Sequence, residues 1–269
     1  MKETGLRIAA GVAAVATVVV TAGPVVAKPS TDQALLLFDD VPKGAPITSP
    51  FNAGTARVTS TTVTLGGGQV IARRARALHS RVAEFPAYDG LEDGARAVIS
   101  VRAKGKVDGL EPGRRPFVLG ADVQLDEVNV GTAEDNGNNV LQRGRFNNAT
   151  QFKLQVDHGR FGCRVKGSDG VLVAESKVTL KPTKWYRARC TREFVEGGER
   201  LVLKVRQRKH ADHWGPVHRA TSDVGAAGEL SFRRKITVSV GGKLGPRGSI
   251  AADTDQFNGR LDNVFLHIR

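Results

Sequence analysis

Apolar and polar residues alternate along several short segments of the chain. In one of them, Phe152, Leu154 and Val156 alternate with polar residues. The same alternation occurs in residues 97–101, 161–166, 201–206, 236–240 and 264–269. A period of two is typical of a β-strand with one buried face. The pattern therefore predicts many short strands between residues 34 and 269, and no segment in this range shows a convincing helical period.

Turn signals that contain glycine separate these segments. They are Asp-Gly at 108–109, Asn-Gly at 136–137, Ser-Asp-Gly at 168–170, Gly-Gly at 197–198 and 241–242, and Asn-Gly at 258–259. Short strands joined by such turns, without alternating helices, are typical of a sandwich or a barrel. The sequence therefore predicts an all-β fold.

Four stretches of the chain carry a resemblance to a known family. They are LEPG at 110–113 with FVLGADV at 117–123, DNGNNVLQRG at 135–144 with QFKLQV at 151–156, CRVKG at 163–167 with WYRARCTR at 185–192, and VGGK at 240–243 with DQFNGRLDNV at 255–264. Through them the chain resembles bacterial laminin G-like domains of the concanavalin A-like lectin/glucanase superfamily. The resemblance implies an antiparallel two-sheet β-sandwich of the jelly-roll type, whose final strand pairs near residues 34–38. It does not specify a ligand, because this superfamily includes lectins, adhesion modules and polysaccharide-cleaving enzymes.

The first 27 residues have the three parts of a secretory signal peptide. A basic start precedes an apolar stretch at residues 8–22, and small residues lead up to Ala27. We expect cleavage after Ala27, a short linker at 28–33 and one laminin G-like domain at 34–269. The alternative is a transmembrane anchor, although the apolar stretch is shorter than the roughly 20 residues that a spanning helix needs. We expect the mature chain to be an extracellular monomer, free or held at the cell surface, that does not insert into a membrane.

The charge balance of the chain is strongly basic. It carries 40 Lys and Arg against 27 Asp and Glu, for a formal net charge of +13, and its pI is near 10.2. Such an excess favours an anionic partner, for which we expect an acidic polysaccharide or a cell-envelope polymer. Nucleic acid would be bound non-specifically through charge alone, because no motif for specific recognition is present. The alternative interpretation of the charge is general solubility.

Seven basic residues occupy positions opposite the apolar ones on the predicted strands. They are Lys153, Arg164, Lys166, Arg187, Arg189, Lys204 and Arg206. If these strands are neighbours in one sheet, the seven side chains form a basic outer face that binds the ligand. Guanidinium groups suit carboxylate, sulfate or phosphate oxygens, which they can hold through two parallel hydrogen bonds. The alternative is that the strands belong to different sheets and the side chains are only solvated.

The chain contains two cysteines, Cys163 and Cys190. In a secreted protein they are expected to form one disulfide, because the compartment is oxidising. The resemblance places their two strands close enough for this bridge. Closing a loop of this length would stabilise the fold by roughly 3–4 kcal/mol.

The sequence lacks the carboxylate pattern that a glycosidase of this superfamily would use. Such enzymes pair two carboxylates across a cleft, and the glucanase branch arranges them close to a Glu-x-Asp-x-x-Glu pattern. Asp126 and Glu127 are adjacent, so they would point to opposite faces of a strand. We therefore expect a non-catalytic binding module. The alternatives are an extracellular polysaccharide hydrolase or lyase, and an adhesion or structural protein that binds another protein.

Calcium is the ion that the resemblance suggests, because laminin G-like domains often carry it. Asp and Asn side chains, whose oxygen atoms are typical calcium ligands, occur in two groups. One group is Asp135, Asn136 and Asn138, and the other is Asp253 and Asp255. Neither group aligns with a calcium motif, so no metal or cofactor is assigned.

Overall fold

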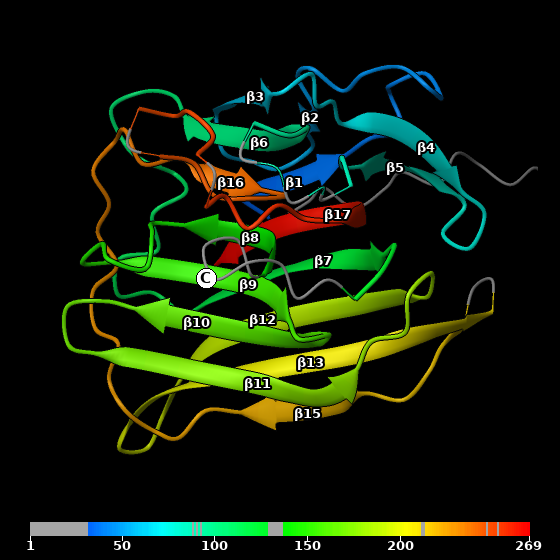
Figure 1. Cartoon of the computed structure of the whole chain (residues 1–269). Coiled ribbons are helices and arrows are strands. Elements are labelled where there is room, and N and C mark those ends of the chain that lie inside the picture. Colours follow the sequence, from blue (N-terminus) through cyan, green and yellow to red (C-terminus); the bar gives the residue numbers. More distant parts are fainter. Residues whose placement is uncertain are drawn as a thin grey trace, which may run out of the picture.

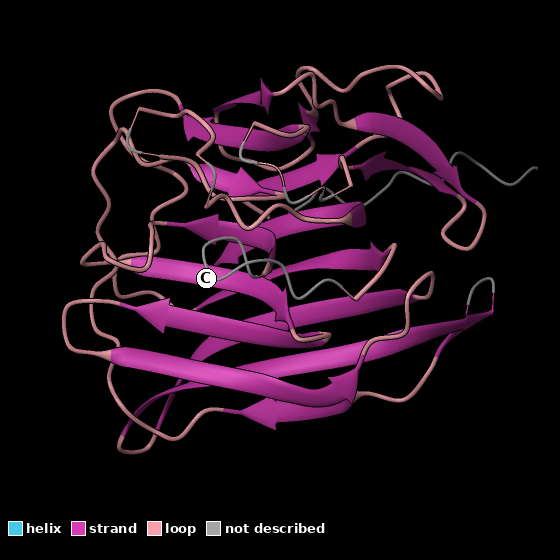
Figure 2. Ribbon diagram, viewed as in Figure 1, coloured by secondary structure: helices cyan, strands magenta, loops and turns pink. Residues whose placement is uncertain are grey.

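The described part of this chain folds into β-strands joined by turns and loops. A computed structural model describes residues 32–87, 89, 91, 93–128, 137–210, 213–245, 247–251 and 253–269. These residues form seventeen strands and no helix, and the strands lie in two antiparallel sheets (Figures 1 and 2). The predicted all-β, antiparallel two-sheet sandwich is therefore confirmed.

The N-terminal segment of the chain falls outside this description. The predicted signal peptide at 1–27 and most of the linker at 28–33 are not among the described residues. The division of the chain into signal peptide, linker and one domain stays a prediction. Within the described ranges, no helix is long and apolar enough to cross a membrane.

The larger sheet contains ten strands. Its main order is β14-β13-β12-β7-β17-β1-β2, while β15 pairs with β13, and the hairpin of β4 and β5 joins β17 through β5. The bounds are β1 Ala34–Leu37, β2 Phe51–Asn52, β4 Ile71–Ala75, β5 Ser80–Glu84, β7 Phe117–Leu125, β12 Trp185–Val195, β13 Gly198–His210, β14 His213–Trp214, β15 His218–Thr221 and β17 Gly259–Ile268.

The smaller sheet contains seven strands in the order β11-β10-β9-β8-β16-β6-β3. The bounds are β3 Val58–Leu65, β6 Arg96–Ala103, β8 Asn138–Arg143, β9 Gln151–Asp157, β10 Arg160–Lys166, β11 Val171–Thr179 and β16 Val238–Val240. Because β16 is inserted between β8 and β6, the segment that follows it reaches the outer face of this sheet. Lys243 and Asp253 from that segment lie there beside β8 and β9.

The two sheets pack face to face around one hydrophobic cluster. Phe152 on β9 contacts Phe117 on β7, with ring centroids 5.7 Å apart, and so joins one sheet to the other. Burying a side chain of this size stabilises the fold by roughly 1.5–3 kcal/mol. The inward positions predicted on β9 and β17 are all buried: Phe152, Leu154, Val156, Val264, Leu266 and Ile268.

The last strand pairs with the first, as expected. β17 runs antiparallel to β1, with Leu35 opposite Phe265. Its pairing with β7 on the other side is interrupted after Asp262, where Asn263 has a φ of 48°. A bulge of this kind turns neighbouring side chains out of simple alternation. Asp262, the residue before this bulge, is buried, and Ser80 of β5 donates a hydrogen bond to its carboxylate.

Strand β6 departs from the predicted half-buried pattern. Ala97, Ile99 and Val101 face the core as expected, but Val98 on the opposite face is also fully buried. Val98 lies against Gly242 in the segment after β16, where a Cβ would approach its Cγ2 atom to 2.6 Å. The outer face of β6 is thus covered by a segment distant in sequence, which local alternation does not predict.

One disulfide joins the two sheets through the core. Cys163 lies on β10 and Cys190 on β12, with their Cα atoms 6.3 Å apart. Both side chains are buried. The predicted bridge is therefore confirmed, and it crosses between the layers of the sandwich.

Candidate ligand-binding groove

The structure divides the seven basic residues between the two sheets. Lys153 belongs to β9, and Arg164 and Lys166 belong to β10, all in the seven-stranded sheet. The other four are on β12 and β13 of the ten-stranded sheet: Arg187, Arg189, Lys204 and Arg206. The outer faces of two stacked sheets point away from each other. A single basic face made of all seven residues is therefore wrong, while a role in binding for each of them stays a prediction.

A hollow of about 490 Å³ lies on the outer face of the seven-stranded sheet. We call it the first hollow. Its lining includes Gln142 of β8, Lys153 and Gln155 of β9, Arg164 of β10, and Lys243 and Asp255 from the segment after β16. The side chains on β9 face outward because Phe152, Leu154 and Val156 between them fill the core. The hollow therefore combines amide groups with charged groups.

Ion pairs link the charged residues of the first hollow. Lys243 Nζ lies 3.4 Å from Asp253 Oδ2 and 3.2 Å from Asp255 Oδ2. Lys153 Nζ lies 3.5 Å from the same oxygen of Asp255, and Arg145 Nη2 lies 2.9 Å from Asp253 Oδ2. Burial lowers the pKa of Lys153, and the nearby carboxylate of Asp255 opposes that shift. The positive charges in the hollow are thus largely balanced within it.

An exposed aromatic ring stands at the rim of the first hollow. Phe146 is 73% exposed, and the guanidinium of Arg164 lies 4.8 Å from its ring centroid. Lys166 Nζ donates to the Phe146 carbonyl at 3.4 Å, and Arg164 Nε donates to Gln151 Oε1 at 3.1 Å. Arg164 and Lys166, which were predicted to contact the ligand, therefore hold the segment that presents Phe146.

The chain bends sharply where this segment leaves β8. Gly144 has a φ of 78°, and a Cβ there would come within 2.1 Å of the Thr150 carbonyl oxygen. Only glycine fits both the left-handed backbone and this close approach. Residues 145–150 consequently fold back over the outer face of the sheet, where Arg145 and Phe146 meet the groups on β9 and β10.

Sequence reasoning missed several residues of this hollow. Gln155 could have been found, because it shares a strand face with Lys153. Arg145, Phe146 and Lys243 lie on connecting segments, and their positions depend on contacts between parts of the chain far apart in sequence. Local alternation carries no signal for them.

The carboxylates of the second candidate calcium group are already paired with cations. Asp253 and Asp255 face Arg145, Lys153 and Lys243 at the distances given above. A divalent cation at this place would be repelled by three positive side chains, so these residues do not fit a calcium site. Asp135 and Asn136 of the other group lie outside the described residues. Among the residues that are described, no three metal-binding side chains gather.

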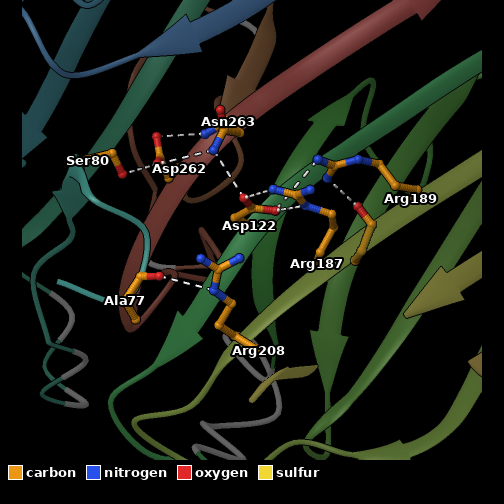
Figure 3. A network of polar contacts seen from close by, with 9 residues as sticks. Ala77, Ser80, Asp122, Arg187, Arg189, Arg208, Asp262 and Asn263 are labelled. Carbon is orange, nitrogen blue, oxygen red and sulfur yellow. Dashed lines mark hydrogen bonds and ion pairs between the residues drawn. The ribbon is translucent and has the colours of Figure 1, made fainter. Parts of the chain in front are cut away.

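Two of the other four predicted residues, Arg187 and Arg189, belong to a polar network on the ten-stranded sheet (Figure 3). Arg187 donates two hydrogen bonds of 2.7 Å to Asp122, whose side chain is fully buried, and this interaction raises the pKa of Arg187. Arg189 lies 3.6 Å from the same carboxylate, and burial lowers its pKa to about 10. Both arginines are therefore held by partners within the protein.

Aromatic rings complete this network. The Trp214 ring lies between two guanidinium groups, that of Arg187 at 4.3 Å and that of Arg208 at 5.0 Å from its centroid. Arg208 also donates to the Ala77 carbonyl in the β4–β5 hairpin at 3.1 Å. Arg206 donates to the carbonyl of Gly215 at 3.0 Å. Of the four predicted residues on this sheet, Lys204 is exposed, whereas the three arginines are partly buried.

The described fold and hollow define an all-β, two-sheet sandwich with a polar groove on its smaller sheet. No protein-family model matches the sequence, and no curated protein matches it significantly.

Several solved structures are similar to this chain. The LG1-3 region of the laminin alpha2 chain matches at 18% identity with a TM-score of 0.43, over 62% of this chain and 30% of that one. The heptameric SAP-like pentraxin from Limulus polyphemus matches at 12% identity with a TM-score of 0.38, over 58% of this chain and 65% of that one. The binding domain of Paraclostridial Mosquitocidal Protein 1 matches at 11% identity with a TM-score of 0.44, over 89% and 50%. This chain thus spans less than two thirds of each of them, and similarities at this level carry no information on a ligand.

Proposed function

We propose that this chain is a secreted, non-catalytic module that binds an anionic glycan or another polymer of the cell surface in the first hollow. The observation that carries the proposal is the combination of outward-facing amides with one exposed aromatic ring. Gln142, Asn147 and Gln155 line the hollow below Phe146. Amide groups both donate and accept hydrogen bonds, as sugar hydroxyls require. An exposed phenyl ring offers a flat apolar surface on which a sugar ring can pack.

Three features support the extracellular and anionic parts of this proposal. The inter-sheet disulfide is typical of proteins in oxidising compartments, and the first 27 residues have the pattern of a signal peptide. The net charge of +13 favours encounter with a negatively charged polymer.

The ion pairs in the first hollow support a non-catalytic role. A glycosidase needs one carboxylic acid to donate a proton and a second carboxylate to act as base or nucleophile. Asp253 and Asp255 both accept contacts from the ammonium group of Lys243. Both carboxylates are therefore engaged in ion pairs within the protein, which supports a structural role for them.

A polysaccharide lyase is the second candidate, and it rests on Lys153. Burial lowers the pKa of this lysine within the hollow, which is a property of lysines that act as bases. A lyase would remove the C5 proton beside a uronate carboxylate while the C4–O glycosidic bond breaks. The departing sugar oxygen takes up a proton from water, and a C4–C5 double bond remains at the new chain end. Incubation with uronate polymers, followed by ultraviolet detection of unsaturated ends, distinguishes this candidate from simple binding.

The binding proposal is tested by removing the aromatic platform. Phe146→Ala should weaken retention on immobilised cell-surface glycan by roughly tenfold, because a sugar that covers one face of the ring gains about half of the roughly 3 kcal/mol that full burial of a phenyl ring contributes. Phe51→Ala is a matched control, since Phe51 is also exposed and lies on β2 of the ten-stranded sheet. Equal retention of both variants and the unmodified protein, measured by affinity electrophoresis, would refute the assignment of this hollow.

A further inference from the structure

A second hollow of about 430 Å³ adjoins the first one on the outer side of the seven-stranded sheet. The two hollows share Gln142, Arg145 and Asn147 in their linings. Gln142 lies on β8, and the other two residues belong to the segment that carries Phe146. A ligand that fills one hollow therefore touches residues that also border the other. An elongated ligand could occupy both at once.

The two hollows differ in charge. The described lining of the first contains four cations and three carboxylates: Arg145, Lys153, Arg164, Lys243, Glu175, Asp253 and Asp255. The described lining of the second hollow contains Arg145, Arg233 and Lys235 and no carboxylate. Arg233 and Lys235 are exposed, so their charged groups are accessible to a ligand. The second hollow thus has a larger surplus of positive charge than the first one.

The positive charge continues beyond the second hollow. Lys235 also borders a third hollow of about 450 Å³, together with Arg102 and Arg234. Asp108 is the carboxylate in its described lining, and the buried guanidinium of Arg143 pairs with it. The three hollows follow one another through shared residues, and cations outnumber carboxylates in the described lining of both the second and the third.

The polar groups of the second hollow suit a sugar as well as an anion. Asn148, Thr150 and Ser239 line it with amide and hydroxyl groups. A simple ion would need only the cations, whereas a sugar also uses hydrogen-bonding groups at fixed positions. Side chains of Arg and Lys hold the oxygens of carboxylate or sulfate groups.

We propose that the second hollow is a subsite for the anionic sugars of a linear acidic polysaccharide, whose neutral sugars occupy the first hollow. This inference rests on the proposed function, because it assigns the first hollow to the same glycan. The polymer would then run from Phe146 across the Arg145 and Asn147 segment toward Arg233 and Lys235. The shared chemistry of its charged groups is an anionic oxygen, from a uronate carboxylate or a sulfate ester.

The test measures the affinity of three immobilised polymers for purified full-length mature protein. Unsulfated chondroitin alternates uronate with neutral sugars, chondroitin sulfate adds sulfate esters, and dextran is neutral. The double variant Arg233→Gln with Lys235→Gln should bind the better acidic polymer about three- to tenfold more weakly, because two exposed charge contacts are lost. Its binding should also depend less on salt. Whichever acidic polymer binds more tightly identifies carboxylate or sulfate as the anionic group.

The matched control is Lys209→Gln with Arg219→Gln, which removes the same charge from exposed positions on β13 and β15 of the ten-stranded sheet. This control should bind as the unmodified protein does. If it weakens binding as much as the first double variant, attraction is a general effect of charge and the subsite is refuted.

The failure of this inference can be told apart from the failure of the proposed function. If Phe146→Ala weakens binding while the Arg233 and Lys235 double variant binds normally, the first hollow binds a glycan and the second subsite is wrong. If neither change affects binding, both proposals are wrong. Thermal melts check that each variant is folded, which exposed substitutions of this kind should not disturb.

Discussion

The buried carboxyl group of Asp262 should make the protein less stable as the pH rises. A single substitution of this residue should remove that dependence on pH. Its side chain is 1% exposed and lies beside Asp122 in the network on the ten-stranded sheet (Figure 3). Burial raises the pKa of Asp262 to about 7, and the Asp122 carboxylate adds to this shift. Hydrogen bonds from Ser80 and from the Asn263 backbone oppose it.

The sign follows from proton binding in the two states. Below about pH 4 the carboxyl group is protonated in both the folded and the unfolded chain. Between about pH 4 and pH 7 the folded state holds the proton while the unfolded state has lost it, so the free energy of unfolding falls as pH rises. The shift from the ordinary value of 3.8 to about 7 is about three pH units, each worth about 1.4 kcal/mol. The total is on the order of 4 kcal/mol.

The substitution Asp262→Asn removes the titrating group while keeping a side chain of the same shape. Its stabilisation relative to the unmodified protein should be greater at pH 8 than at pH 5 by roughly 2–3 kcal/mol. Unfolding in guanidinium chloride, followed by tryptophan fluorescence with the disulfide intact, measures this difference. Asp223→Asn, at an exposed position, is the control and should show little dependence on pH. If the Asp262→Asn difference is equal at both pH values, the reasoning about burial is wrong.

Two further predictions concern packing. Replacing Cys163 and Cys190 with Ala should lower the free energy of unfolding by roughly 3.6 kcal/mol on the chain-entropy model, given their separation of 27 residues; denaturant titration checks this, and a loss below about 1 kcal/mol would contradict it. Gly120→Ala should cost about 1–3 kcal/mol, because its Cβ would lie 2.4 Å from a backbone oxygen and 2.7 Å from Arg189. Gly162→Ala, whose Cβ would have its nearest atom 3.6 Å away, should leave the stability of the fold nearly unchanged. Thermal melts of the two variants measure this difference.

The inward faces of the strands were predictable because they depend on local alternation. Phe152, Leu154 and Val156 had to share one side of a strand, whichever strands became their neighbours. The disulfide was also predictable, since the chain has only two cysteines. The inward position of these side chains therefore follows from residues close to them in the sequence.

The outward faces were less predictable because their surroundings depend on which strands are neighbours. Arg187 meets Asp122, 65 positions away, because β12 pairs with β7. No residue near Arg187 in the sequence indicates that Asp122 is its partner. Lys153 is likewise paired with Asp255 through the insertion of β16. The prediction that Arg187 and Lys153 face outward on their strands was therefore correct. It did not follow that their charged groups are free to bind a ligand.

The position of the disulfide has a mechanical consequence for ligand binding. β11 is the edge strand of the seven-stranded sheet, and β10 lies next to it. Tension from a polymer bound over these strands would tend to peel them from the sheet edge. Cys163 on β10 also borders the first hollow, so a covalent link runs from beneath the bound polymer to the opposite layer. Load that a bound polymer placed on the groove would thus be shared by both layers, and the disulfide would keep β10 attached to the ten-stranded sheet.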